Sequence, residues 1–220
     1  MKGTFVSDKI TIAEKLTKIK AFIFDWDGVF NDGNKTQNQP SGYSEVDSMG
    51  INLLRFAYWL TTSEIPTLAI ITGAENPSAL EFAKREHFDC VYMHFTNKKE
   101  AFQHFCTIQD FKPEETAYFF DDINDLVIAK QVGLRWLIQH EANPLFREWV
   151  SQQQYCDYIT QQEGGKHAIR EVCEMIWQLR NQYAAVIEAR IQFEGEYQTY
   201  FQERQKIETK LFKKEKITFL

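Results

Sequence analysis

The stretch Ala21-Phe22-Ile23-Phe24-Asp25-Trp26-Asp27-Gly28 joins four apolar residues to two acids and a glycine. The apolar run predicts a buried strand that delivers Asp25 and Asp27 to the edge of a sheet. Neighbouring carboxylates repel each other, and removing them from water costs several kcal/mol. A chain tolerates this cost where a cation binds or where one carboxylate acts as a nucleophile. The alternative is a strand followed by an ordinary Asp–Gly turn, in which the acid bonds its own backbone.

Apolar runs alternate with helical patterns along the rest of the chain. Further strands are predicted at 67–71, 91–93, 116–120, 135–138 and 158–160, and helices at 8–19, 50–62, 77–87, 98–107, 124–132 and 164–179. Alternation with short connections indicates a Rossmann-like α/β fold, in which helices cover both faces of a parallel sheet. Such sheets bind ligands beyond the carboxyl ends of their strands. We therefore expect the functional site at that edge.

The composition changes near residue 179. Residues 1–178 carry the alternating pattern and are predicted to form the core domain, within which the Asn- and Gly-rich segment Asn31–Ser44 predicts a small β-hairpin flap. Residues 179–220 are polar and aromatic, and their apolar residues recur at helical spacing, which predicts a helical C-terminal extension. Because an isolated amphipathic helix is marginal in water, we expect the extension to dock on the protein's own body or on a partner chain. A partly frayed terminal helix is the alternative.

Charge and cysteine content limit the class of protein. A net charge of −6 argues against general nucleic-acid binding. The four cysteines are scattered without metal-binding spacing, which predicts reduced thiols. The sequence has neither a signal-peptide pattern nor an apolar run long enough for a membrane span. We therefore expect a cytoplasmic protein with no nucleic-acid or membrane partner.

Residues suited to phosphate chemistry follow the predicted strands. They are Asp25 and Asp27 after the first strand, Thr72 after the second, Asp121, Asp122 and Asp125 after the strand at 116–120, and Lys98 at the start of a helix. Mg²⁺ prefers carboxylate ligands, and a carboxylate can attack phosphorus as a nucleophile. An ammonium group and a hydroxyl can hold a phosphoryl group. A second acid two residues after the nucleophile can protonate the leaving alcohol and later activate water.

Some of these residues also have plainer interpretations. Lys98 could be a solvated lysine at a helix start, and Asp122 and Asp125 could be helix caps. Asn76 and Asn143, each followed by proline, predict the starts of two helices. The histidines form no triad or ligand pair that the sequence identifies: His87, His94, His104, His140 and His167.

The ordered set of motifs resembles the haloacid dehalogenase (HAD) superfamily of aspartate-nucleophile phosphatases. The motifs are DxDG at the first strand, Thr-Gly at the second, a helix-starting Lys and then DDxxD, and the match covers residues 20 to about 176. The resemblance implies that Asp25 is the nucleophile and a Mg²⁺ ligand. It implies that Asp27 is the acid and base and gives its carbonyl to the metal. The other positions implied are the phosphoryl-binding Thr72 and Lys98, the metal ligand Asp121, and the supporting Asp122 and Asp125.

The finer pattern is similar to the capless subfamily of 3-deoxy-D-manno-octulosonate (KDO) 8-phosphate phosphatases and their nonulosonate relatives. The segments that carry this similarity are 25–33, 47–51, 97–102 and 164–173. The resemblance implies a homotetramer without a cap domain, acting in lipopolysaccharide biosynthesis. Ala74 stands where that family commonly has Arg, so the substrate-facing positions differ. The candidate substrate-binding residues are Gly73, Asp32, Lys166 and Arg170.

We therefore expect a Mg²⁺-dependent phosphomonoesterase with an aspartyl-phosphate intermediate. Its expected substrate is a small phosphorylated sugar acid such as KDO 8-phosphate. One alternative is a phosphatase of nonulosonate 9-phosphate or another small-sugar phosphate. The other is a non-catalytic assembly or regulatory protein on the same fold. Retention of Asp25, Asp27, Lys98 and Asp121 favours the enzyme.

Overall fold

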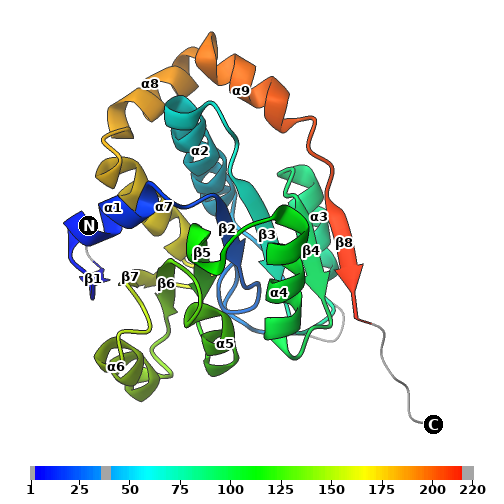
Figure 1. Cartoon of the computed structure of the whole chain (residues 1–220), viewed down its shortest axis with the longest axis vertical. Helices are drawn as coiled ribbons and strands as arrows, with labels where there is room; N and C mark the ends of the chain where they lie inside the picture. Colours follow the sequence, from blue (N-terminus) through cyan, green and yellow to red (C-terminus); the bar gives the residue numbers. More distant parts are fainter. Residues whose placement is uncertain (1–2, 36–40, 215–220) are drawn as a thin grey trace.

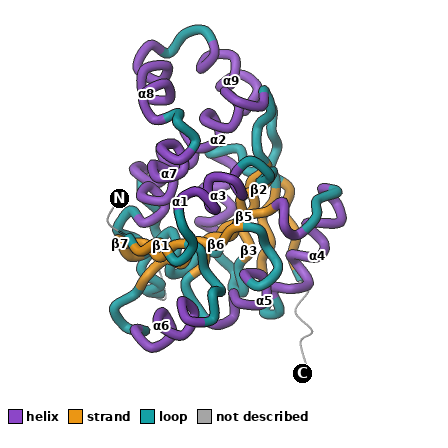
Figure 2. Tube along the Cα trace, turned by 60° about the vertical axis from the view of Figure 1, so that its left-hand side comes forward, coloured by secondary structure: helices purple, strands orange, loops and turns teal. Residues whose placement is uncertain are grey.

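One eight-stranded sheet runs through the molecule (Figures 1 and 2), as seen in a computed structural model that describes residues 3–35 and 41–214. The strands are β1 (Thr4–Phe5), β2 (Ala21–Phe24), β3 (Thr67–Ile71), β4 (Cys90–Met93), β5 (Thr116–Phe120), β6 (Leu134–Gln139), β7 (Tyr158–Glu163) and β8 (Lys210–Lys213). Their order is β1-β7-β6-β5-β2-β3-β4-β8, and every pair is parallel except β1–β7. The strand that leads to Asp25, β2, therefore lies inside the sheet, between β5 and β3.

Helices cover both faces of this sheet (Figure 2). One face carries α1 (Lys9–Leu16), α2 (Glu45–Thr62), α3 (Pro77–Arg85) and α7 (Ala168–Leu179), and the other carries α4 (Lys98–Gln109), α5 (Leu126–Ala129) and α6 (Pro144–Gln152). Side chains alternate along a strand, so Phe22 and Phe24 pack in one apolar layer while Ala21 and Ile23 pack in the other. The structure confirms the predicted α/β architecture.

The segment before α2 differs from the predicted β-hairpin. Residues 31–35 and 41–44 contain no strand, and residues 36–40 lie outside the described part of the chain. The side chains of Asn31 and Asp32 accept hydrogen bonds from the backbone N–H groups of Gly33 (2.9 Å) and Asn34 (3.0 Å). Such side chain–backbone bonds compete with strand pairing. The polar composition therefore produces local turns here.

The C-terminal extension returns to the core after crossing α2 (Figure 1). It contains the predicted helical structure, in α8 (Tyr183–Gln192) and α9 (Glu196–Arg204), followed by the strand β8, which the sequence did not predict. β8 pairs in parallel with β4, with Val91 opposite Leu211. Without it, β4 would be an edge strand with unpaired backbone groups. The extension thus docks on the protein's own body.

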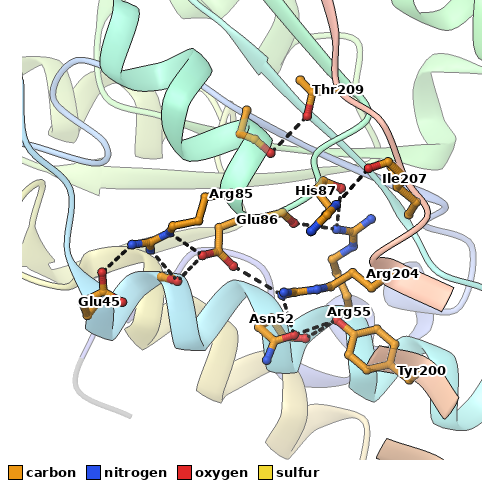
Figure 3. Close-up of polar contacts among 12 residues, drawn as sticks. Glu45, Asn52, Arg55, Arg85, Glu86, His87, Tyr200, Arg204, Ile207 and Thr209 are labelled. Atoms are coloured by element: carbon orange, nitrogen blue, oxygen red, sulfur yellow. Dashed lines mark hydrogen bonds and ion pairs between the residues drawn. The ribbon is translucent and has the colours of Figure 1, made fainter. Parts of the chain in front are cut away.

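Buried polar contacts hold α9 against α2 (Figure 3). The Asn52 backbone carbonyl accepts a hydrogen bond from the Tyr200 hydroxyl (2.8 Å), and the Asn52 side-chain oxygen accepts one from Arg204 (2.9 Å). Arg204 also pairs with Glu86 at 3.3 Å, and both side chains are buried. Because a buried charge without a partner is costly, these contacts fix the position of α9 on α2.

Two findings bear on the expectations from composition. Within residues 3–35 and 41–214, no helix is both long and apolar enough to cross a membrane.

The cysteines are all free thiols: Cys90, Cys106, Cys156 and Cys173. Three of the four are buried, and burial raises the pKa of the Cys90 thiol to about 11. The three buried thiols pack as small apolar side chains.

Replacing Arg204 with Ala is expected to lower the free energy of unfolding by about 3 kcal/mol, because Glu86 and Asn52 lose a buried, charged donor. Urea denaturation measures this change. The matched control is Lys206→Ala, an exposed residue just beyond α9, which should change stability by less than about 0.5 kcal/mol. Equal effects of the two substitutions would contradict the anchoring role of Arg204.

Candidate active site

A cavity of about 620 Å³ lies at the carboxyl edge of the sheet. Parallel strands that neighbour each other end at the same edge, so residues far apart in the sequence meet there. The sequence-predicted residues that line this cavity are Asp25, Asp27, Asp32, Thr72, Gly73, Lys98, Asp121 and Asp122. A second cavity of about 860 Å³ lies at the opposite edge, where Lys20 pairs with Glu115 (2.6 Å). The side chains predicted to take part in catalysis therefore lie together at the carboxyl edge of the sheet.

Lys98 lies between two buried carboxylates. Its Nζ is 2.7 Å from Asp25 Oδ1 and 2.6 Å from Asp125 Oδ1, and only 3% of the Lys98 side chain is exposed. Burial and the adjacent Asp125 carboxylate raise the pKa of Asp25 well above its usual range. Burial alone would lower the pKa of Lys98, but the two carboxylates outweigh it and raise that pKa. Lys98 is therefore a charged, buried group and not a solvated lysine at a helix start.

Asp125 and Asp122 differ in their surroundings. Asp125 is fully buried, and its Oδ1 also accepts a hydrogen bond from the Tyr118 hydroxyl (2.5 Å). Asp122 is exposed and precedes the short 3₁₀ helix η2 (Ile123–Asp125), where its side chain accepts from the Ile123 N–H (2.7 Å). Asp122 thus acts as a helix cap at the rim of the cavity, while Asp125 belongs to the buried cluster.

Asp121 is positioned by His140 and by Gly28. His140 Nε2 donates to Asp121 Oδ2 (3.2 Å) and to the Gly28 carbonyl (3.1 Å). The hydrogen bond with Asp121 raises the pKa of His140. Gly28 has a φ of 80°, and a Cβ at this position would collide with the Asp121 carboxylate. No sequence pattern assigns a role to His140; the available signal was its place directly after β6, a strand that neighbours β5.

The acidic cluster fits a hard divalent cation. Asp25, Asp121 and Asp125 each offer a carboxylate oxygen, and these oxygens lie within 4.8 Å of one another. In the part of the chain that the structure describes, the buried Asp121 Oδ1 has no hydrogen-bond partner, and burial raises the pKa of Asp121. A buried charged oxygen without a partner is unfavourable, and carboxylate oxygens are ligands that Mg²⁺ prefers. The side chain of Asp27 is not part of this cluster, although the resemblance assigns its carbonyl, not its carboxylate, to the metal.

The side-chain amide of Asn76 links Asp27 and Thr72. Asp27 Oδ2 accepts from Lys35 Nζ (2.7 Å) and from Asn76 Nδ2 (2.9 Å). The same Asn76 nitrogen lies 2.8 Å from Thr72 Oγ1. Asn76 occupies the predicted N-cap position of α3, but its side chain makes no capping hydrogen bond. The sequence thus predicted the position of Asn76 but not its partners.

Lys166 and Arg170 do not line the acidic cavity, contrary to the prediction that they bind substrate. Lys166 pairs with Glu163 (2.7 Å), and Arg170 pairs with Glu174 (2.9 Å), beside a separate shallow hollow. The backbone N–H of Arg170 donates to Asp47 Oδ1 (2.9 Å), which ties α7 to α2. Within this chain, both side chains therefore form ion pairs with nearby glutamates.

Comparison with known proteins identifies relatives that share this fold. No family model matches the chain. The KDO 8-phosphate phosphatase KdsC of Yersinia pestis is 28% identical over 169 residues, covering 75% of this chain and 83% of the relative. A structure from Legionella pneumophila, assigned to the HAD superfamily (subfamily III A), is 29% identical with a TM-score of 0.68, covering 83% of this chain and 95% of that one. The KDO 8-phosphate phosphatase of Moraxella catarrhalis, solved with magnesium, phosphate and KDO, is 27% identical with a TM-score of 0.66. The match covers 81% of this chain and 97% of that one.

A parallel sheet that gathers acids and a buried lysine at its carboxyl edge defines a hydrolase of the HAD type. This chain belongs to the HAD superfamily, in the group that contains the KDO 8-phosphate phosphatases, and it is a phosphatase: a structure of that group from Vibrio cholerae is 30% identical to it, and the chain covers 90% of that structure. The predicted resemblance and the predicted enzyme class are thereby confirmed.

Replacing His140 with Ala is expected to weaken Mg²⁺ binding by about 10-fold or more, because Asp121 loses the donor that orients it. Isothermal titration of the metal-free protein with MgCl₂ measures this directly. His140→Gln restores a side-chain N–H donor and should retain more of the affinity. If His140→Ala binds Mg²⁺ as tightly as the unaltered protein, His140 does not position a metal ligand.

Proposed function

We propose that this phosphatase is a Mg²⁺-dependent phosphomonoesterase that forms an aspartyl-phosphate intermediate on Asp25. One observation carries the proposal: the buried Lys98 ammonium lies between Asp25 and Asp125, with the Asp121 carboxylate in the same cluster. This arrangement provides a nucleophile, a cation to offset its charge, and the ligand set for a metal ion. The magnesium and phosphate in the Moraxella catarrhalis relative support the choice of metal and reaction.

The first step transfers the phosphoryl group to the protein. A carboxylate oxygen of Asp25 attacks phosphorus, and the bond between phosphorus and the alcohol oxygen breaks. The electron pair of that bond stays on the alcohol oxygen, which takes a proton from the Asp27 carboxyl group. Lys98 and the Thr72 hydroxyl hold the phosphoryl oxygens. When bound, a Mg²⁺ ion held by Asp25, Asp121 and the Asp27 carbonyl would offset charge on those oxygens.

The second step releases inorganic phosphate. The Asp27 carboxylate takes a proton from water, and the water oxygen attacks phosphorus in the aspartyl phosphate. The bond between phosphorus and the Asp25 oxygen breaks, which restores the Asp25 carboxylate. Asp27 ends this step protonated and is ready for the next substrate. Asp25 and Asp27 therefore have separate roles, although only one residue lies between them.

For the substrate, we propose a small phosphorylated sugar acid such as KDO 8-phosphate. The names of the relatives and the KDO bound in the Moraxella catarrhalis structure support this class. Gly73 and Asp32 line the cavity and are the predicted substrate contacts that the geometry favours. Ala74 offers no anion-binding side chain where the resembling family commonly has Arg, and nonulosonate 9-phosphate or another small-sugar phosphate is the alternative substrate. The proposal also includes assembly as a homotetramer, which the family resemblance supports.

Asp25→Asn is expected to lower kcat at least 1000-fold on any phosphate monoester, because the amide is a far weaker nucleophile than the carboxylate. The assay measures phosphate release with Mg²⁺ and after chelation by EDTA, which should abolish activity in the unaltered protein. Asp110→Asn is the matched control, since Asp110 is exposed at the end of α4. Mg²⁺-dependent activity that survives Asp25→Asn would disprove the nucleophile assignment.

A substrate panel separates the proposed sugar acids. We expect kcat/KM for KDO 8-phosphate to exceed that for glucose 6-phosphate by at least 10-fold, since distal contacts contribute to transition-state binding. A nonulosonate 9-phosphate forms the third arm of the panel. If the nonulosonate ester is hydrolysed fastest, the alternative substrate replaces KDO 8-phosphate. Equal rates on all three esters would refute specificity for a sugar acid.

A further inference from the structure

We propose that Asn76 is a positioning residue that sets the orientation of both Thr72 and Asp27 for phosphoryl transfer. The inference rests on the proposed function of this site. Asn76 is buried, with 4% of its surface exposed, and it lies at the start of α3. Its side chain is the one group in the described part of the structure that hydrogen-bonds to both residues. It therefore connects the phosphoryl-binding hydroxyl to the proton-transferring acid.

The contacts of Asn76 define which way its amide points. Its nitrogen faces two oxygens, Asp27 Oδ2 at 2.9 Å and Thr72 Oγ1 at 2.8 Å. Its oxygen faces Lys35 Nζ at 3.3 Å. The reverse orientation would place the amide oxygen against the Asp27 carboxylate and the amide nitrogen against an ammonium group. An amide nitrogen carries two hydrogens, so one is donated to Asp27 and the other to Thr72.

This orientation decides what the Thr72 hydroxyl does. Thr72 Oγ1 accepts from Asn76, and it also lies 3.4 Å from the Ala74 backbone N–H. A hydroxyl has two acceptor positions and one hydrogen. With its oxygen turned toward these donors, the Thr72 hydrogen is left to point into the cavity that Thr72 lines. Asn76 thereby makes Thr72 a donor toward a phosphoryl oxygen.

The same amide distinguishes the two oxygens of Asp27. Oδ2 is held by Asn76 and by Lys35, at 2.9 Å and 2.7 Å. Oδ1 is buried and has no hydrogen-bond partner among residues 3–35 and 41–214. Asn76 and Lys35 thus fix the orientation of the Asp27 carboxyl group through Oδ2, the oxygen that they both contact.

Two substitutions of Asn76 test this role. The Asn76 side chain makes no capping hydrogen bond, so Asn76→Asp removes no cap from α3. It removes both amide hydrogens, however, and places a carboxylate beside Asp27. Asn76→Ala removes the amide without adding a charge and serves as the second variant.

The decisive measurement is kcat/KM for two leaving groups. An alkyl phosphate needs its leaving oxygen protonated by Asp27, whereas p-nitrophenolate leaves as a stable anion. We expect Asn76→Ala and Asn76→Asp to lower kcat/KM about 100-fold for the alkyl ester, the contribution of a general acid. For p-nitrophenyl phosphate the loss should be about 5-fold, the effect of one weakened hydrogen bond at Thr72. Asn181→Asp, an exposed residue between α7 and α8, is the matched control and should leave both values unchanged.

Each outcome separates this inference from the proposed function. If both esters lose the same factor, or neither loses any, Asn76 does not position Asp27 and the inference fails. In that case the proposed function still stands when the unaltered protein is active and Asp25→Asn is not. If the unaltered protein lacks Mg²⁺-dependent activity, or Asp25→Asn retains it, the proposed function fails and takes the inference with it.

Discussion

The constraint on which the site depends is the concentration of negative charge inside the protein. Three carboxylates, from Asp25, Asp121 and Asp125, meet with one ammonium group, from Lys98. One positive charge cannot balance three negative ones, and burial makes the imbalance more costly than it would be in water. The buried strands β2 and β5 lead to Asp25 and Asp121, while η2 and α4 supply Asp125 and Lys98, and together they hold these groups against their repulsion. A divalent cation bound at this cluster would offset the remaining charge, so the proposed metal and the protein scaffold would act as one unit.

The sequence predicted the parts of the structure that local patterns determine. Apolar runs such as Ala21–Phe24 became strands because they are buried on both faces, and the acids after them reached one edge because the strands are parallel. The buried position of Lys98 followed the same logic, since a helix that begins near this edge directs its first residue toward it. The core of the site was therefore predictable from strand order and from the spacing of motifs.

The remaining site residues depend on partners that no local pattern contains. Asn76 and Asn143, each before a proline, have the sequence of an N-cap, yet neither side chain makes a capping hydrogen bond. Each amide instead lies near the acids: Asn76 donates to Asp27, and the Asn143 amide lies 3.5 Å from the Asp121 carbonyl. In Asn76 the oxygen that a cap would use accepts from Lys35 instead of from a backbone N–H group of α3. His140 is a similar case, because its role appears only when β6 lies beside β5.

The C-terminal extension matters to the site through β4, whose carboxyl end leads to Lys98. β8 supplies the backbone partners of β4, and Phe212 stacks on Tyr92 with ring centroids 4.8 Å apart. Lys213 also pairs with Glu75 (3.0 Å), but exposed ion pairs contribute little to stability. The strand pairing and the buried contacts of α9, rather than these surface charges, are what fix the extension. It follows that the extension stabilises an edge of the sheet that directly supports the site.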